Sequence, residues 1–175
     1  MNELQIRAIV DDLVRAWNSR DMGRFLELLD ESVVWEDPAM LFGPAKGRAG
    51  VRAFSESILR AFPDFAYRIR EPICVSQSGT RCAVPWEIQA THTGYFDILG
   101  LAPTMQTITM RGVDLLEIQD MKVIRIETLF NVLPAFEQAL RLRPLSRGSL
   151  LMKLAVLLQR SRAFWLRLTT PRRQL

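Results

Sequence analysis

The order of two hydrophobic periodicities along the chain constrains its fold more than any other feature. Apolar residues recur at helical spacing over residues 3–17, in a short stretch that Asp21 can cap, and over residues 51–62. Strand-like runs then fill residues 65–76, 81–93, 105–118 and 122–130. Helices followed by consecutive strands are typical of an α+β fold with an antiparallel sheet, which we therefore predict. A last helix is expected to begin near Pro134, because proline suits a first turn.

Charge divides the 175-residue chain into two parts. Residues 141–175 carry nine Lys and Arg and no acid, whereas residues 1–140 carry the other 14 basic residues and all 19 acidic ones. The net charge of +4 therefore combines a body of −5 with a tail of +9. We predict a single domain over residues 1–140 followed by a basic helical extension over 141–175. The acidic body gives no reason to expect a nucleic-acid partner.

The basic extension is amphipathic over residues 146–168. Lys153, Arg160 and Arg167 repeat every seven residues on one narrow stripe, and most of the remaining surface is apolar. One interpretation is a helix lying on an anionic membrane surface. The alternative is a helix packed on the body or exchanged with a dimer partner. Because no secretory signal or membrane span is recognisable, we predict a cytoplasmic protein, membrane-associated if the first interpretation holds.

Cysteine and histidine are scarce. Cys74 and Cys82 flank a turn and could approach each other across a hairpin, but free thiols in a reducing cytosol are favoured over a disulfide. His92 is the only histidine, and no Cys/His cluster has metal-ligand spacing. We predict neither a metal site nor a cofactor.

The string Val33-Val-Trp-Glu-Asp-Pro38 places a carboxylate among apolar neighbours. Side chains alternate faces along a strand, so Val33, Trp35 and Asp37 share one face. Pro38 ends the strand and holds Asp37 in an extended conformation. Burying a carboxylate is costly unless it is hydrogen-bonded or protonated, so Asp37 is either a general base or a cap for the following loop.

A second carboxylate, Asp114, falls on the more apolar face of the strand at 107–117, where desolvation would raise its pKa.

His92 shares a parity with Trp86, so it either points inward as a proton relay or is a strand-end histidine bonded to a backbone carbonyl. Glu87 and Arg111 take the opposite faces, which suggests the outer surface or a dimer contact. Aromatic and methionine side chains are expected to form the pocket wall or core: Trp35, Trp86, Phe96, Met105 and Met110.

Six strings in this order resemble the SnoaL-like and ketosteroid isomerase-like group of the nuclear transport factor 2-like superfamily. They are Ala16-Trp-Asn-Ser-Arg-Asp21, Val34-Trp-Glu-Asp-Pro38, Ala61-Phe-Pro-Asp-Phe65, Thr91-His-Thr-Gly94, Gly112-Val-Asp-Leu115 and Met121-Lys-Val-Ile124. The resemblance implies a cone, in which a curved antiparallel sheet folds around an apolar pocket and helices close it. It also implies a homodimer. Such cones serve many chemistries, so the fold does not decide the function.

The resemblance also assigns roles to residues. Asp37 matches the general base of ketosteroid isomerases, and Asp114 matches their protonated oxyanion donor; the isomerase is a standard example of carboxylate tuning. The isomerase tyrosine is replaced, with Leu13 at its position. Asn131 stands where SnoaL-like cyclases carry their acid/base aspartate, so it is expected only to contact a ligand. The Arg-x-Asp string of limonene epoxide hydrolases is absent from Trp86-Glu-Ile-Gln-Ala90.

We therefore predict a cofactor-independent isomerase or cyclase that transfers protons on a lipophilic polyketide, terpenoid or steroid-like substrate. Asp37, Asp114 and His92 would be catalytic. The substrate would contact Trp35, Trp86, Phe96, Met110 and Asn131. The alternatives are a non-catalytic protein that binds a lipophilic ligand and a membrane-tethered interaction module.

Overall fold

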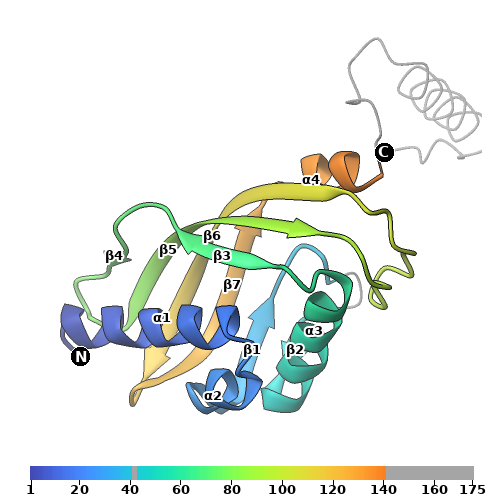
Figure 1. Ribbon diagram of the computed structural model, residues 1–175. Coiled ribbons are helices and arrows are strands. Elements are labelled where there is room, and N and C mark those ends of the chain that lie inside the picture. Colours follow the sequence, from blue (N-terminus) through green and yellow to red (C-terminus); the bar gives the residue numbers. More distant parts are fainter. Residues whose placement is uncertain (41–42, 141–175) are drawn as a thin grey trace, which may run out of the picture. The chain divides into compact units, whose positions relative to one another are not determined.

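The computed structural model describes residues 1–40 and 43–140 of the chain (Figure 1). The predictions for the basic extension fall on residues 141–175, outside that part. Within residues 1–40 and 43–140 there are four helices: α1 (Glu3–Asn18), α2 (Met22–Glu27), α3 (Gly47–Ala61) and α4 (Val132–Ala139). Seven strands accompany them: β1 (Leu29–Glu36), β2 (Ala45–Lys46), β3 (Ala66–Ile69), β4 (Cys74–Val75), β5 (Arg81–Thr91), β6 (Thr107–Gln119) and β7 (Lys122–Phe130).

The first two helices begin where side chains satisfy their free N–H groups. Asn2 and Gln5 form a reciprocal capping box at the start of α1. Asp21 accepts a hydrogen bond from the backbone N–H of Arg24 at 2.9 Å, which confirms Asp21 as the cap of α2. Most of the apolar stripe of α1 is buried, as its periodicity predicts: Ile6, Ile9, Val10, Leu13 and Trp17. Leu4, in the first turn, is instead exposed.

The strands form one sheet in the order β2-β1-β7-β6-β5-β3, with β4 also paired to β5. The α+β prediction with N-terminal helices is confirmed, and the sheet curves over α1 in Figure 1. The sheet is mixed, however, because β1 and β7 run parallel while the other pairs are antiparallel. Most of the domain separates β1 from β7 in sequence, so no tight hairpin imposes an antiparallel pairing.

The predicted strand at 65–76 is interrupted. β3 ends at Ile69 and β4 begins at Cys74, with Pro72 between them. Proline has no backbone N–H for the ladder and therefore disfavours an unbroken strand there. Cys74 is exposed and Cys82 is buried, and both are free thiols, as predicted.

Strand register places the middle of β6 at the centre of the sheet. Asp114 lies opposite Val84 of β5 on one side and Thr128 of β7 on the other. Trp35 of β1 pairs with Ile126 of β7, so Asp37, just beyond β1, lies beside the end of β7. The inward faces of these strands and the buried stripe of α1 belong to one hydrophobic core. Among the described helices, none is long and apolar enough to cross a membrane.

Candidate active site

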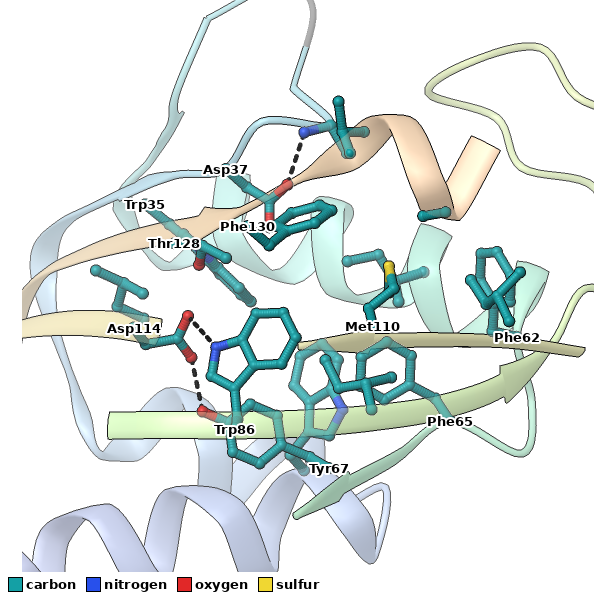
Figure 2. A pocket seen from close by; sticks show the side chains of 18 of the residues that line it. Trp35, Asp37, Phe62, Phe65, Tyr67, Trp86, Met110, Asp114, Thr128 and Phe130 are labelled. Atoms are coloured by element: carbon teal, nitrogen blue, oxygen red, sulfur yellow. Dashed lines mark hydrogen bonds between the residues drawn. The ribbon is translucent and has the colours of Figure 1, made fainter. Parts of the chain in front are cut away.

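A cavity of about 170 Å³ lies within the curve of the sheet. Its wall is almost entirely apolar or aromatic, and Figure 2 shows how these rings surround it. Within the described part of the chain, no lysine or arginine lines it. The lining residues with side-chain oxygen, or with an imidazole, are Asp37, Tyr67, His92, Asp114 and Thr128. Polar chemistry in this cavity therefore depends on a few groups.

Asp37 combines the two roles that its sequence context allows. One carboxylate oxygen accepts a hydrogen bond from the backbone N–H of Ala39 at 2.7 Å, so the side chain does cap the following turn (Figure 2). The side chain also lines the cavity. Burial raises the pKa of Asp37 to about 6; the Ala39 hydrogen bond lowers it, and the nearby Asp114 raises it further. A carboxyl group with this pKa can both take and release a proton near neutral pH.

Asp114 accepts hydrogen bonds on both oxygens (Figure 2). Trp86 Nε1 donates to Oδ1 at 3.0 Å, and the Tyr67 hydroxyl donates to Oδ2 at 2.8 Å. The nearby Thr128 hydroxyl also lowers the pKa of this carboxyl group. Burial raises the pKa of Asp114 and outweighs the lowering effect of these hydrogen bonds. The carboxyl group is thus desolvated, as its strand face predicts, but surrounded by donors.

The Trp86 ring reaches Asp114 because Gly112 lies opposite it on β6. A Cβ atom at Gly112 would overlap the Trp86 ring and the Leu129 carbonyl. The glycine therefore lets the indole lie against β6 and direct its N–H to a carboxylate two residues further along the strand.

Tyr67 is positioned through its backbone by α1. The Asn18 side chain donates to the Tyr67 carbonyl at 2.8 Å and accepts from the Tyr67 N–H at 2.9 Å. Burial, reinforced by Asp114, raises the pKa of the Tyr67 hydroxyl well above its usual value. The phenol consequently stays neutral over the ordinary pH range.

Thr128 lies between two parts of the site. One is Trp35 on β1, the strand that leads to Asp37, and the other is Asp114 on β6. Trp35 Nε1 donates to Thr128 Oγ1 at 2.9 Å, and both side chains are buried. An indole N–H can only donate, so the Thr128 oxygen acts as the acceptor in this pair. The proton of the hydroxyl remains available for Asp114.

Comparison with known proteins identifies the family. The model of the SnoaL-like polyketide cyclase family matches residues 7–139. The chain belongs to the SnoaL-like polyketide cyclase family. No curated protein matches it.

Solved structures show the same fold. AclR from Streptomyces galilaeus is 24% identical, with a TM-score of 0.68 over 81% of this chain and 100% of its own. A protein from Jannaschia sp. CCS1, assigned as a SnoaL-like polyketide cyclase, is 20% identical, with a TM-score of 0.69 over 78% of this chain and 92% of its own. SalBIII, an epoxide hydrolase/cyclase-like enzyme, is 21% identical, with a TM-score of 0.63 over 74% and 93%. At these identities, the likeness establishes the fold alone.

Several predicted site residues of this SnoaL-like chain do gather. Asp37 and Asp114 interact electrostatically and line the same cavity. Trp35, Trp86, Phe96 and Met110 are in its wall, and their contact with a substrate remains a prediction. Leu13 lines the cavity too. Among the described residues, no group of three or more His, Cys, Asp or Glu could hold a metal ion.

His92 lines the cavity at the end away from Asp114. It follows the end of β5, eight positions after Val84, the residue opposite Asp114, which is a path of about 26 Å along an extended chain. Its ring stacks on Phe62, with centroids 5.0 Å apart, and Figure 2 shows Phe62 far from Asp114. Nδ1 pairs with Thr104 Oγ1 at 3.2 Å, and burial lowers the pKa of the imidazole. The inward orientation is one of the two alternatives that the sequence leaves open, but a relay to Asp114 does not fit this position.

Two other expectations are corrected. Asn131 is exposed and is not among the residues that line the cavity; it caps α4 by accepting from the Leu133 N–H at 3.2 Å. α4 begins at Val132, which places Pro134 in its first turn as predicted and leaves Asn131 as the N-cap residue. Met105 is 67% exposed, with φ of 58°, because it lies in the turn before β6 rather than in the wall.

Two polar residues of the cavity, Tyr67 and Thr128, are not indicated by any motif in the sequence. Thr128 had a usable signal, because it shares its strand face with Ile126 and Phe130, which also line the cavity. The sequence signal for Tyr67 was weaker, because its contact with Asp114 depends on the register of the short strand β3. Glu87 and Arg111 form an ion pair of 2.7 Å on the outer face of the sheet, as their parity predicts.

Proposed function

We propose that this chain is a cofactor-independent enzyme that moves a proton at a carbon beside a carbonyl group, as a cyclase or isomerase does. The observation that carries this proposal is the pair of carboxyl groups, Asp37 and Asp114, in different hydrogen-bonding environments at the polar end of an apolar cavity. Membership of the SnoaL-like family supports it. Two carboxyl groups in unlike environments are a common arrangement for an acid and a base.

Asp37 is the base. With a pKa of about 6, it is largely ionised at neutral pH and is still basic enough to accept a proton from an activated carbon. In this step, the C–H electron pair moves into the carbonyl system and Asp37 becomes a carboxylic acid. The same proton returns to a different carbon in an isomerisation. In a cyclisation, the enolate carbon instead bonds to a second carbonyl carbon. The π pair of that carbonyl moves to its oxygen, which takes the proton from Asp37 and becomes a hydroxyl group.

Tyr67 and Asp114 stabilise the oxygen that gains charge. When Asp114 holds a proton, it donates to the Tyr67 oxygen, and the Tyr67 proton is directed to the substrate oxygen. As that oxygen becomes negative, Tyr67 donates to it and takes the Asp114 proton in return. Asp114 is then ionised, and the proton returns when the product carbonyl forms. Tyr67 thus supplies a phenol to a cavity in which Leu13 replaces the isomerase tyrosine.

The cavity favours a neutral substrate with aromatic or alicyclic rings. Two neighbouring carboxyl groups and no described basic residue in the wall disfavour a free carboxylate or phosphate. The aromatic wall would instead bury ring surface, which is consistent with a polyketide, terpenoid or steroid-like compound.

The donors around Asp114 also favour a second candidate, a ligand-binding protein without turnover. The hydrogen bonds from Tyr67 and Trp86, with the nearby Thr128 hydroxyl, stabilise the ionised carboxylate, a form that cannot deliver a proton. In that case, the cavity would carry or sense the same class of neutral ligand.

An exchange assay separates the two candidates. Deuterium incorporation next to the carbonyl of 2-tetralone in D2O, followed by NMR, measures proton abstraction directly. We expect the wild type to accelerate exchange and Asp37→Asn to lose about 100-fold or more of that rate while retaining affinity. Affinity can be followed by the fluorescence of the wall tryptophans. Asp11→Asn on the exposed face of α1 is the matched control. Ligand binding without exchange in the wild type would exclude the enzyme and favour the carrier.

A further inference from the structure

The hydrogen bonds of Asp114 are of two kinds. Trp86 can only donate through its indole N–H. Thr128 already accepts from the Trp35 N–H, which leaves its own proton for Asp114. Tyr67 differs from both, because a phenol can donate or accept. Among the described partners of Asp114, Tyr67 is therefore the one that can reverse its role without loss of other hydrogen bonds.

From this arrangement, we infer that Tyr67 determines which ligands this cavity accepts and that its hydrogen-bonding role toward the ligand follows the proton on Asp114. The inference rests on the proposed function, because both require a ligand to bind at the same polar end of the cavity. It assigns a ligand preference that switches with pH: carbonyl acceptors bind in one state, and hydroxyl donors in both.

The two states follow from the single proton of the phenol. With Asp114 ionised, that proton is directed to Oδ2, and the Tyr67 oxygen offers only lone pairs to the cavity. A hydroxyl ligand can donate to it, whereas a carbonyl ligand meets an acceptor and is left without a partner. With Asp114 protonated, the carboxyl group donates to Tyr67 and the phenol proton turns to the cavity. A carbonyl ligand then gains its hydrogen bond.

The surroundings make Tyr67 suited to this role. Asn18 holds its backbone by two hydrogen bonds, so the phenol can reverse its proton without moving its ring. The titratable groups near the pair are Asp37, at the end of β1, and Cys82, on β5. Burial raises the pKa of Cys82 to about 11, so this thiol stays neutral in the range of interest. Asp37 is the remaining group whose titration must be separated from that of Asp114.

The test compares two neutral ligands of similar size, 2-tetralone as a carbonyl acceptor and 2-tetralol as a hydroxyl donor. Binding is measured by tryptophan fluorescence at stepped pH values across the whole range in which the protein stays folded. For the wild type, we expect the ratio of the tetralone Kd to the tetralol Kd to increase about tenfold as Asp114 ionises. The tetralol Kd should change little.

Three variants assign the change to residues. Tyr67→Phe and Asp114→Asn should each abolish the pH dependence of the ratio. Asp37→Asn should preserve it, because Asp37 is not the partner of Tyr67. A ratio that does not change with pH in the wild type, or one that still changes in Tyr67→Phe, would overturn the inference.

Thr128 provides an independent measurement. Thr128→Val removes one donor from the ionised carboxylate and should move the midpoint of the ratio to higher pH, whereas Thr128→Ser retains the hydroxyl and should leave it unchanged. Equal midpoints in the valine and serine variants would contradict the arrangement of donors. Because only binding is measured, the result holds whether or not the chain catalyses exchange, and failure of the exchange assay leaves this test intact.

Discussion

At the scale of single residues, the buried carboxyl groups cost stability, and the cost depends on pH. The folded-state pKa of Asp37, about 6, exceeds the ordinary value of 3.8, so the native state binds this proton more tightly than the unfolded chain does. The contribution of Asp37 to the free energy of unfolding is therefore lost as pH rises from about 4 to about 6. At neutral pH, the ionised side chain is a destabilising group.

We accordingly predict that Asp37→Asn is more stable than the wild type at pH 7, by about 1 to 2 kcal/mol after allowance for contact with water in the cavity. The advantage should vanish at pH about 4, where both proteins carry a neutral side chain. Urea unfolding at the two pH values measures this difference. Equal stability at pH 7 would indicate that Asp37 is better solvated than its position suggests.

Gly112 is the residue on which the orientation of Trp86 depends. We predict that Gly112→Ala destabilises the fold by about 2 kcal/mol or more, because the added methyl group overlaps an indole ring and a backbone carbonyl. The substitution should also displace Trp86 from Asp114, which NMR of the indole N–H would detect.

Gly23→Ala is the matched control for that substitution. Gly23 lies in α2, and an added Cβ atom would meet only the Asp21 side chain, at 3.5 Å. Alanine is a better helix former than glycine, so this variant should be neutral or slightly stabilising. Similar losses in both variants would mean that the Trp86 overlap is relieved by a small shift.

At the scale of elements, one side chain of α4 forms two hydrogen bonds with the sheet. Gln138 accepts from the Thr109 N–H at 2.8 Å and donates to the Thr109 carbonyl at 3.2 Å, so it imitates a neighbouring strand at the start of β6. The other face of α4 contributes Val132, Ala135, Phe136 and Ala139 to the cavity wall. The position of α4 and the closure of the cavity are therefore linked.

We predict that Gln138→Ala loosens α4, with faster hydrogen exchange at the Thr109 amide and faster ligand dissociation. Gln138→Glu keeps an acceptor for the Thr109 N–H but loses the donor to the carbonyl, so an intermediate effect is expected. Hydrogen-exchange NMR and stopped-flow fluorescence measure the two rates. Unchanged dissociation in Gln138→Ala would show that ligands leave by another route.

Element patterns in the sequence predict much of this arrangement. Strand alternation correctly places Asp37, Asp114 and Trp86 toward one interior, because each lies on a strand whose apolar parity is clear. The same alternation leaves His92 apart from the carboxyl pair, since it specifies a face but not a distance along that face. Asn131 directly precedes the last helix, where the sequence places it, but neither that position nor the family resemblance distinguishes a helix cap from a ligand contact.

At the scale of the whole molecule, the unpredicted parts of the site depend on pairing between distant segments. The Trp35–Thr128 hydrogen bond requires β1 and β7 to run parallel, and no local pattern encodes that choice. Tyr67 reaches Asp114 only through the register of β3 on β5 and of β5 on β6. A homodimer remains a prediction, as does the role of the basic extension.

The parallel pair of β1 and β7 also has a consequence for biosynthesis. A ribosome delivers residue 35 long before residue 128, so Trp35 and Asp37 leave the exit tunnel without the strand against which they pack. Thr128 arrives only as the described domain nears its end. The nascent chain would thus expose an unpaired strand edge and an incomplete cavity for most of its synthesis. With this topology, the exposed edge must be protected from aggregation during synthesis, either by chaperones or by rapid late folding.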